Sequence, residues 1–454
     1  MIPPSLLKKV AQAITPSLAE KKAEAEMVRG LLKRIHSEKG SHVDAVLAGS
    51  MARDTHVKGD RDIDIFVFYP PSLSREKFEK AGLKLGHTIF GKSFHEEAYS
   101  EHPYVRGVIH GFNVEIVPTY KVNHASEKLS AVDRTPFHAE YVKKHLSEKQ
   151  CTDVRLLKQF FKGIQTYGAD VKMQGVPGFL VELLILHYGS FSKTLEGMSS
   201  WKDGTLVDVQ KHHSSAHFPT PPFLLVVDPT DASRNVAAAL SYNQFARMIA
   251  ASRAFLKKPS EKFFFAHVEK PLPLSRVRSL LQNEDILGVH FPYPAGVLSD
   301  VMWGQLPRWG KKLVHALEQH DFCIRRMFVW TDEKKSCVIL VDVENPLLQS
   351  SRVKLGPRVT DEVSSARFLH AHPRPLSGPR IEEGRLVVVE KRPVFHVEDA
   401  LEVEWKKIAS AEKDKRFLAK GKPFSEKEVL ALAKKNPEFH RALGVFVQGK
   451  EFFW

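Results

Sequence analysis

Two aspartates are the residues of this 454-residue chain that are best placed to do chemistry. Asp62 and Asp64 stand two positions apart in the apolar segment DIDIFVFY, so on a strand both would point to the same face. Like charges in an apolar setting need a cation beside them. Carboxylate oxygens favour Mg²⁺ or Mn²⁺, and such ions usually recruit substrate phosphates. The pair therefore indicates phosphoryl or nucleotidyl transfer, although Asp-x-Asp alone more often marks a solvated strand edge.

Residues suited to phosphate binding surround the pair. Gly49 and Ser50 end the preceding apolar segment, where a small residue lets backbone N–H groups approach a phosphate and the Ser50 hydroxyl can donate. Arg53 offers a guanidinium whose fork of N–H donors matches the spacing of phosphate oxygens. Glu115, in the apolar string VEIVP, is a third carboxylate that could help hold a metal near an attacking hydroxyl.

The string GHTIFGKS, from Gly86 to Ser93, matches the P-loop expression GxxxxGK[ST]. A P-loop follows a buried strand and opens a helix, whereas this string follows the helical pattern REKFEKAGLKLG and precedes an extended one. We therefore predict that it does not bind nucleotide phosphates.

The elements that must position these residues form an α+β, multidomain chain. Residues 1–140 predict a small mixed sheet with helices, the catalytic domain, in which Pro118 is expected to end its strand. Residues 141–262 predict a helical middle domain, with a helix opening in DASRNVAAALS.

Residues 263–454 predict a C-terminal body and tail. A β-α-β-β order there resembles ferredoxin-like or RNA-recognition folds. Lysines are interleaved with Trp405 and Phe417 in the tail, which is either a solvated helix face or an RNA-contacting surface.

The charge balance favours a polyanionic partner. Lys and Arg number 67 against 53 Asp and Glu, a net charge of +14. The longest apolar stretch, 178–189, contains Glu182 and is too short to span a bilayer, and we expect no membrane association. The three cysteines are widely spaced without a Cys-x-x-Cys pattern, and no secretory leader is evident. We therefore expect a cytoplasmic protein.

Several segments in order carry a family resemblance: AGSMARDT, DIDIFVFY, YSEHPYVRG, VEIVPTYKV, SAVDRTPFHAEYV, DVRLLKQFFKGIQTYGA, VPGFLVELLILHYGSF and VVDPTDASRNVAAALS. With them the chain resembles the archaeal, class I CCA-adding enzymes, tRNA nucleotidyltransferases of the nucleotidyltransferase superfamily. The resemblance implies Mg²⁺-dependent transfer of CMP, CMP and AMP from CTP and ATP to the 3′ end of tRNA, without a nucleic-acid template and with release of diphosphate. It also implies that the middle domain, 141–262, binds nucleotide and tRNA and that the C-terminal body and tail, 263–454, bind tRNA. A homodimer is a further possibility that it implies.

The resemblance implies roles for particular residues, which are as follows: Asp62, Asp64 and Glu115 bind metal; Ser50 and Arg53 contact the triphosphate; His138, Lys158 and Tyr167 bind the incoming nucleotide, with Thr135 and His102 nearby; Arg234 helps to read the base. The family usually has Asp where this chain has Glu115. A poly(A) or oligoadenylate-type polymerase of the same fold and a catalytically weakened tRNA-binding protein stay open as alternatives.

Overall fold

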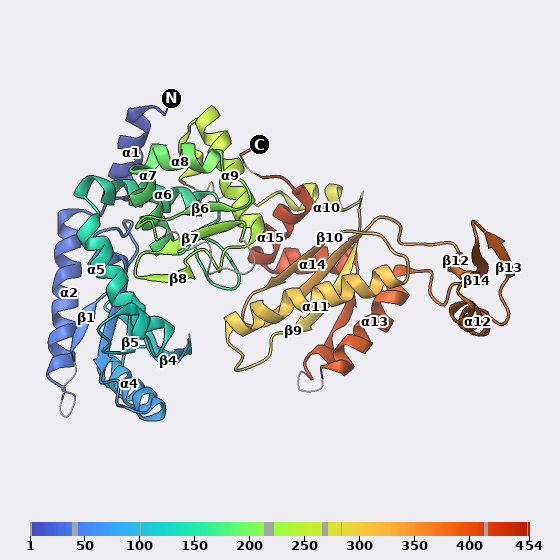
Figure 1. Cartoon of the computed structure of the whole chain (residues 1–454), viewed down its shortest axis with the longest axis horizontal. Coiled ribbons are helices and arrows are strands. Elements are labelled where there is room, and N and C mark those ends of the chain that lie inside the picture. The colour runs from blue at the N-terminus through green and yellow to red at the C-terminus, as the bar shows by residue number, and fades with distance from the viewer. Residues whose placement is uncertain are drawn as a thin grey trace. The chain divides into compact units, whose positions relative to one another are not determined.

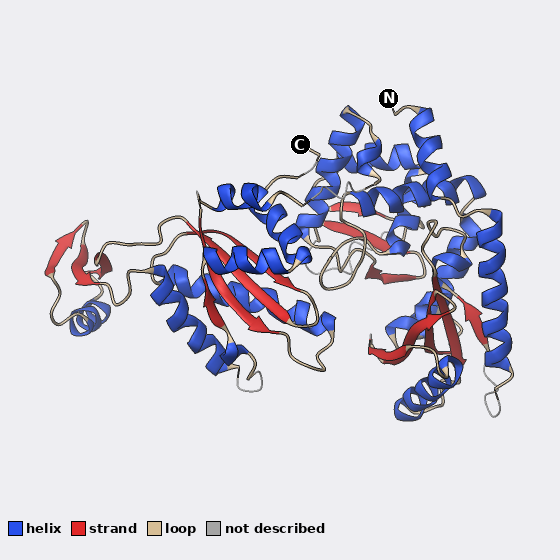
Figure 2. Ribbon diagram, turned by 180° about the vertical axis from the view of Figure 1, so that it is seen from behind, coloured by secondary structure: helices blue, strands red, loops and turns tan. Residues whose placement is uncertain are grey.

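The computed structural model of the chain forms two compact units, Met1–His267 with Phe453–Trp454, and Val268–Phe452. It describes residues 2–38, 44–99, 101–212, 222–265, 271–282, 284–412, 416–451 and 453–454. Helices and strands are mixed in both units, which confirms the predicted α+β, multidomain class (Figures 1 and 2). In the described part of the chain, no helix is both long and apolar enough to cross a membrane.

The helices of the first unit are α1 (Pro4–Ile14), α2 (Leu18–His36), α3 (Gly49–Ala52), α4 (Arg75–Phe90), α5 (Thr135–His145), α6 (Glu148–Gly163), α7 (Gly178–Tyr188), α8 (Phe191–Ser199) and α9 (Tyr242–Lys257). Its strands are β1 (Ala45–Leu47), β2 (Asp62–Tyr69), β3 (His95–Tyr99), β4 (Pro103–Ile109), β5 (Phe112–Tyr120), β6 (Thr205–Val207), β7 (Leu224–Asp228) and β8 (Asp231–Asn235).

The first sheet has the strand order β1-β2-β5-β4-β3, in which β2 and β5 are parallel and the other pairs antiparallel. One face is apolar, because Ile63 and Ile65 of β2 and Val114 of β5 pack with side chains of α2 and α4 in one core. Side chains alternate along a strand, so the residues between these, among them Asp64, belong to the opposite face. That face carries the candidate site.

Aromatic packing holds the helical part of the first unit together. Phe160 of α6 lies at the centre of a cluster of rings, with centroids 5.5 Å from Phe255 of α9 and 6.1 Å from Phe191 of α8. A capping box between Ser147 and Gln150 starts α6, so its register is set at the first turn. This rigid helix carries Lys158 toward the first sheet.

The second unit is built around a sheet of order β10-β11-β9-β15. The chain runs β9, α11, β10, β11, α13 and β15, which is the β-α-β-β-α-β order of a ferredoxin-like fold. A small domain of β12, α12, β13 and β14 is inserted between β11 and α13. The elements of the unit are α10 (Leu274–Leu281), β9 (Asp285–Pro292), α11 (Ser299–Gln319), β10 (Ile324–Thr331), β11 (Ser336–Val343), β12 (Ser351–Arg358), α12 (Glu362–Ala371), β13 (Ser377–Glu382), β14 (Arg385–Lys391), α13 (Val397–Ala411), β15 (Lys422–Phe424), α14 (Glu426–Lys435) and α15 (Pro437–Gln448).

Two local predictions were wrong. Pro118 does not end its strand, because β5 runs on to Tyr120 and pairs Pro118 with Val67. The segment 231–235 is strand β8, not a helix start, because it turns back antiparallel on β7. Trp405 of the basic tail is 3% exposed and its indole N–H donates to the carbonyl of Leu418, so it belongs to the core, whereas Lys406 and Lys407 on the same helix are exposed. Two lysines of the same tail, Lys413 and Lys415, lie outside the described residues.

The P-loop-like string has the structural context that the sequence predicts, a helix before it and an extended segment after it. Helix α4 continues through most of the string to Phe90, and extended strand β3 follows at His95.

Candidate active site

The three carboxylates lie on the neighbouring strands β2 and β5. The parallel register pairs Asp64 with Glu115, and Asp62 with Asn113. All four side chains line one cavity of about 340 Å³. Residues 51 positions apart in the sequence thus pair on one face of the sheet.

Burial and mutual repulsion of these carboxylates outweigh the charges of the nearby cations Arg53, Lys158 and Arg106. Burial, followed by repulsion from Asp64, raises the pKa of Glu115 to about 7. Burial and the charge of Asp62 also raise the pKa of Asp64. Buried acids whose charged forms are destabilised in this way are suited to neutralisation by a cation.

The donor set consists of oxygen atoms, which suits a hard divalent ion such as Mg²⁺ or Mn²⁺. Asp62 accepts a hydrogen bond of 2.8 Å from the Asn113 side-chain amide. Among the described residues, no three His, Cys, Asp or Glu side chains are gathered closely enough to hold an ion as they stand. Ion binding at Asp62, Asp64 and Glu115 therefore requires rotation of at least one carboxylate.

A second group of side chains on the same cavity is cationic or hydroxylic: Ser50, Arg53, Lys158 and Tyr167. Ser50 and Arg53 are held at the site by α3 and its end, whereas Lys158 comes from α6. The Lys162 ammonium of α6 donates to Asp60 at 2.6 Å and lies 5.4 Å from the Tyr167 ring centroid, which ties the loop before β2 to this helix. The cavity is thus carboxylate-rich on one side and cationic on the other.

Glu182 of α7 organises the cationic side. Its Oε1 accepts from Arg53 Nε at 2.9 Å and from the Thr55 hydroxyl at 2.6 Å. The Lys158 ammonium in turn donates to Thr55 Oγ1 at 3.5 Å. Because Glu182 is fully buried, it acts as a fixed anion that holds two cations at the cavity wall.

Burial lowers the pKa of Lys158 to about 8, and the charge of Glu182 opposes this shift. In the sequence, Glu182 is visible only as an interruption of an apolar stretch. A single acid inside the helix GFLVELLILHY was the available signal, because a fully buried charge needs a partner.

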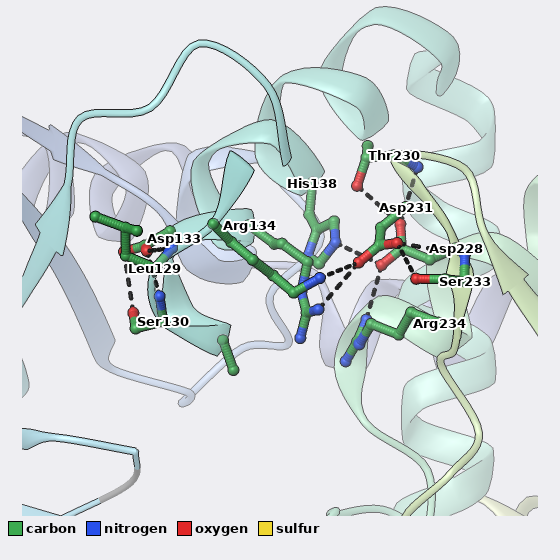
Figure 3. A network of polar contacts seen from close by, with 12 residues as sticks. Leu129, Ser130, Asp133, Arg134, His138, Asp228, Thr230, Asp231, Ser233 and Arg234 are labelled. Atoms are coloured by element: carbon green, nitrogen blue, oxygen red, sulfur yellow. Dashed lines mark hydrogen bonds and ion pairs between the residues drawn. The ribbon is translucent and has the colours of Figure 1, made fainter. Parts of the chain in front are cut away.

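A second polar network joins His138 to Arg234 (Figure 3). Asp228, at the end of β7, accepts from His138 Nε2 at 2.8 Å and from Arg234 Nη1 at 2.9 Å with the same oxygen. Burial opposes the charge of Asp228, but hydrogen bonds and the neighbouring His138 hold the pKa of this carboxyl well below its usual range. Asp228 was missed in the sequence, where it stands in the segment VVDPTD.

Asp231 extends this network on the next strand. It accepts from Lys128 at 2.7 Å and from Arg134 at 3.1 Å, so the chain before α5 is tied to β8 (Figure 3). Burial raises the pKa of Asp231, but its bonds to Lys128, Ser233 and Arg134 outweigh this and lower the pKa to about 2.

The two networks meet at Phe179. Its ring lines the carboxylate cavity and stacks on His138 with centroids 4.0 Å apart. Arg234 lines a separate cavity of about 540 Å³, whose other walls include Ala169 and Pro177. Arg234 and His138 are therefore linked to the site through Asp228 and Phe179, without lining the carboxylate cavity themselves.

The remaining two predicted site residues, Thr135 and His102, lie outside the carboxylate cavity. Thr135 is the first residue of α5, one turn before His138, and is partly buried. His102 is 2% exposed and packs edge-on against Phe78 at 5.0 Å, in the core of the first unit. Neither lines the carboxylate cavity, and for His102 the core packing is the reason.

The raised pKa of Glu115 predicts a pH-dependent stability in metal-free protein. Below pH 4.5 the residue is protonated in both the folded and unfolded states; between 4.5 and about 7 the folded state holds the proton longer. Stability is therefore lost as pH rises through this window, by about 3 kcal/mol at most. Urea unfolding is measured with EDTA present. The free energy of unfolding of the Glu115→Gln variant should rise relative to that of wild type from pH 4.5 to 7. Parallel curves over this range would contradict the assignment.

Family models match three consecutive parts of the chain. A nucleotidyltransferase domain model matches residues 28–138, a model for the second domain of tRNA nucleotidyltransferase matches 152–265, and a model for the C-terminal domain of CCA-adding enzyme matches 283–415. The first two contain all the candidate site residues described above.

Curated relatives match along most of the chain. The CCA-adding enzyme of Halobacterium salinarum is 38% identical over 394 residues, 85% of this chain and 85% of that protein. The CCA-adding enzyme of Methanosarcina acetivorans is 36% identical, over 81% of each chain. That of Saccharolobus shibatae is 33% identical, over 86% of this chain and 89% of that protein.

Proposed function

Because this chain belongs to the CCA-adding enzymes, a family of tRNA nucleotidyltransferases, we propose that Asp62, Asp64 and Glu115 form its catalytic metal site. The chain is a nucleotidyltransferase that adds CCA to tRNA, with CTP and ATP as substrates. The observation that supports the placement of the site is the parallel register of β2 and β5, which sets Asp64 beside Glu115 on the cavity.

Enzymes of this superfamily use divalent metal ions, and we propose Mg²⁺, with Mn²⁺ as a substitute, because every proposed ligand is a carboxylate oxygen. When bound, such an ion lowers the pKa of the attacking 3′ hydroxyl and stabilises charge on the phosphate. The carboxylates of Asp62, Asp64 and Glu115 place that charge at one end of the cavity. Glu115 is one methylene longer than the Asp usual in the family and sits on the cavity wall in register with Asp64.

The cationic wall is proposed to bind the nucleotide triphosphate. Ser50, Arg53 and Lys158 can donate to phosphate oxygens, and Glu182 holds Arg53 by Nε alone, which leaves the two terminal nitrogens of its guanidinium for other acceptors. Tyr167 is placed to hydrogen-bond a phosphate or sugar from the same wall. Charge developing on the leaving diphosphate would be met by preorganised donors in a partly dry site.

The His138–Asp228–Arg234 network is proposed to orient Arg234 for base recognition. Asp228 fixes the guanidinium at one end, and a charged, hydrogen-bonded anchor limits the positions that the rest of the side chain can take. Thr135 and His102 are proposed to lie near the bound nucleotide. His102 would contribute only by packing against Phe78.

One assay tests the function and its alternatives together. Protein is incubated with tRNA lacking CCA, with both CTP and ATP, one of them labelled, and with Mg²⁺ or Mn²⁺. Addition of three nucleotides that stops after A is expected, and EDTA should abolish it. A long adenylate product would identify a poly(A)-type polymerase; tRNA binding without any metal-dependent incorporation would identify a catalytically weakened tRNA-binding protein.

Gly49 provides a sharp test of the site's geometry. A Cβ at this position would lie 1.8 Å from Asp64 Oδ2, so Gly49→Ala must displace that carboxylate. Because catalysis depends on ligand positions within fractions of an ångström, we expect nucleotide addition to fall roughly 100-fold. Steady-state kinetics with tRNA and CTP measures this.

Gly59→Ala is the matched control. Both glycines have positive φ, +66° at Gly49 and +88° at Gly59, so both substitutions pay a similar backbone strain. Nothing lies within 4 Å of a Cβ added at Gly59. Equal losses of activity in the two variants would mean that backbone strain, and not the Asp64 position, causes the effect.

Three further expectations stay proposals. They are a division into domains at residues 1–140, 141–262 and 263–454, a cytoplasmic location consistent with three free cysteines, and a homodimer. The molar mass of the purified protein in solution tests the homodimer.

A further inference from the structure

Two histidine rings face each other at the end of α4, on the P-loop-like string and the strand after it. His87 Nδ1 lies 3.0 Å from His95 Nε2. The ring of His95 is held by stacking on Phe90, with centroids 5.3 Å apart. This pair belongs to α4 and β3, and neither residue lines the carboxylate cavity.

The outer nitrogen of each ring is already engaged. His95 Nδ1 lies 2.7 Å from the carbonyl oxygen of Ser93, and His87 Nε2 lies 2.9 Å from a carboxylate oxygen of Glu97. Both partners only accept hydrogen bonds, so both outer nitrogens must carry the proton. In neutral rings, the two inner nitrogens then face each other with lone pairs.

Two lone pairs at 3.0 Å repel unless something positive lies between or beside them. Imidazole nitrogens are ligands for borderline transition metals. Two nitrogens on one tetrahedral Zn²⁺, each at about 2.0–2.1 Å, would lie roughly 3.3 Å apart. The observed separation is close to this value.

We propose that His87 and His95 bind a divalent transition-metal ion of the Zn²⁺ class, with water completing its coordination. The Glu97 carboxylate and the Ser93 carbonyl would then be the outer partners that metal-binding histidines usually have, fixing the tautomer and ring orientation. The site is separate from the carboxylate centre, and its nitrogen ligands select a different ion from the all-oxygen set there.

The ion would have a structural role. β3 is the edge strand of the first sheet and is joined through β4 to β5, which carries Glu115. A metal bound by His87 and His95 would clamp the C-terminal turn of α4 to this edge. It would thereby stabilise the β3–β4 hairpin without taking part in nucleotide addition.

The test is the zinc content of the full-length protein. Metal-free protein is dialysed against Zn²⁺ in a large excess of Mg²⁺, so that the carboxylate centre is saturated, and then against Zn²⁺-free buffer. We expect His87→Gln and His95→Gln each to retain one zinc fewer per chain than wild type. Glu97→Gln should weaken the binding of this zinc by roughly 10- to 100-fold.

His124→Gln is the matched control, because His124 is an exposed histidine of the same unit and lies on a different segment. It should keep the wild-type zinc content. X-ray absorption of the zinc-loaded protein should show two imidazoles on this ion, and zinc should raise the unfolding temperature of wild type but not of the two histidine variants. CCA addition with Mg²⁺ in these variants verifies that they are folded.

Equal zinc content in wild type and both histidine variants would overturn the proposal. So would a wild type that binds no zinc, in which case a shared proton explains the facing nitrogens. Neither result would touch the assignment of CCA addition, which is measured in Mg²⁺ alone.

Discussion

Replacing Asp64 with asparagine is expected to reduce nucleotide addition roughly 1,000-fold or more, with tRNA affinity close to wild type. Asp64 lies between Asp62 on its own strand and Glu115 on the neighbouring one, so it is the carboxylate most able to share an ion. The amide keeps the shape of the side chain but removes the charge that such an ion needs. Loss of one group that stabilises transition-state charge typically costs 10²–10³-fold, and loss of the metal costs more.

The measurement is single-turnover addition of labelled CMP, combined with filter binding of tRNA. Asp44→Asn is the control, because Asp44 is a surface aspartate of the same unit paired with Lys121 at 2.7 Å. It should retain wild-type addition. Near-normal turnover by the Asp64→Asn variant would contradict the proposed metal site.

Replacing Glu182 with glutamine is expected to destabilise the protein and to weaken nucleotide binding together. The substitution leaves Arg53 and Lys158, which are both largely buried, without their shared anion. Breaking a buried ion pair by removing one partner typically costs about 3–5 kcal/mol, and urea unfolding should show a loss of this order. Such a loss is a large part of the stability of an ordinary domain.

The effect on binding has a predictable pH dependence. The pKa of Lys158 is about 8 with Glu182 present, because the anion partly offsets burial. Without that anion the pKa falls further, so less of the ammonium is charged at neutral pH. We therefore expect the KM for CTP to rise by roughly tenfold near pH 7.5 and to recover as pH is lowered, since acid restores the charge on Lys158.

Glu196→Gln serves as the control, because Glu196 is an exposed acid on the adjacent helix α8. It should match wild type in stability and in KM at every pH. If Glu182→Gln behaved like this control, Glu182 would not organise the cationic wall of the cavity. A rise in KM that did not depend on pH would argue for loss of packing instead of loss of charge.

Local patterns explain how much of the site could be predicted. The alternation in DIDIFVFY correctly predicted strand β2 and put Asp62 and Asp64 on one face. The apolar string around Glu115 correctly predicted a strand as well. No local pattern contains the pairing of β2 with β5, because register between strands distant in sequence depends on the whole sheet.

The predictions that failed or were missing concern tertiary contacts. Pro118 is tolerated inside β5 because the pairing of β5 with β4 ends at Ile116, so Pro118 has no partner on that strand that needs an N–H donor. A Cβ at Gly82 of α4 would meet the Pro118 ring at 2.6 Å, so the glycine lets helix and strand approach closely. Asp228 and Glu182 gained their roles from partners 90 to 129 residues away. Sequence windows cannot contain such partners, although a buried acid in an apolar segment signals that one exists.

The bond between Arg53 and Glu182 spans 129 residues, and this separation sets an order of events during synthesis. When a ribosome has made the sheet with its three carboxylates, Lys158 and α7 do not yet exist. At about 5–20 residues per second, Arg53 waits roughly ten seconds for its anion. The nascent sheet thus carries a carboxylate cluster with Ser50 and Arg53 but without Lys158 and Tyr167 of the cationic wall. The complete site forms only when the helical part has been made, so a bound nucleotide would stabilise the finished first unit and not its leading half alone.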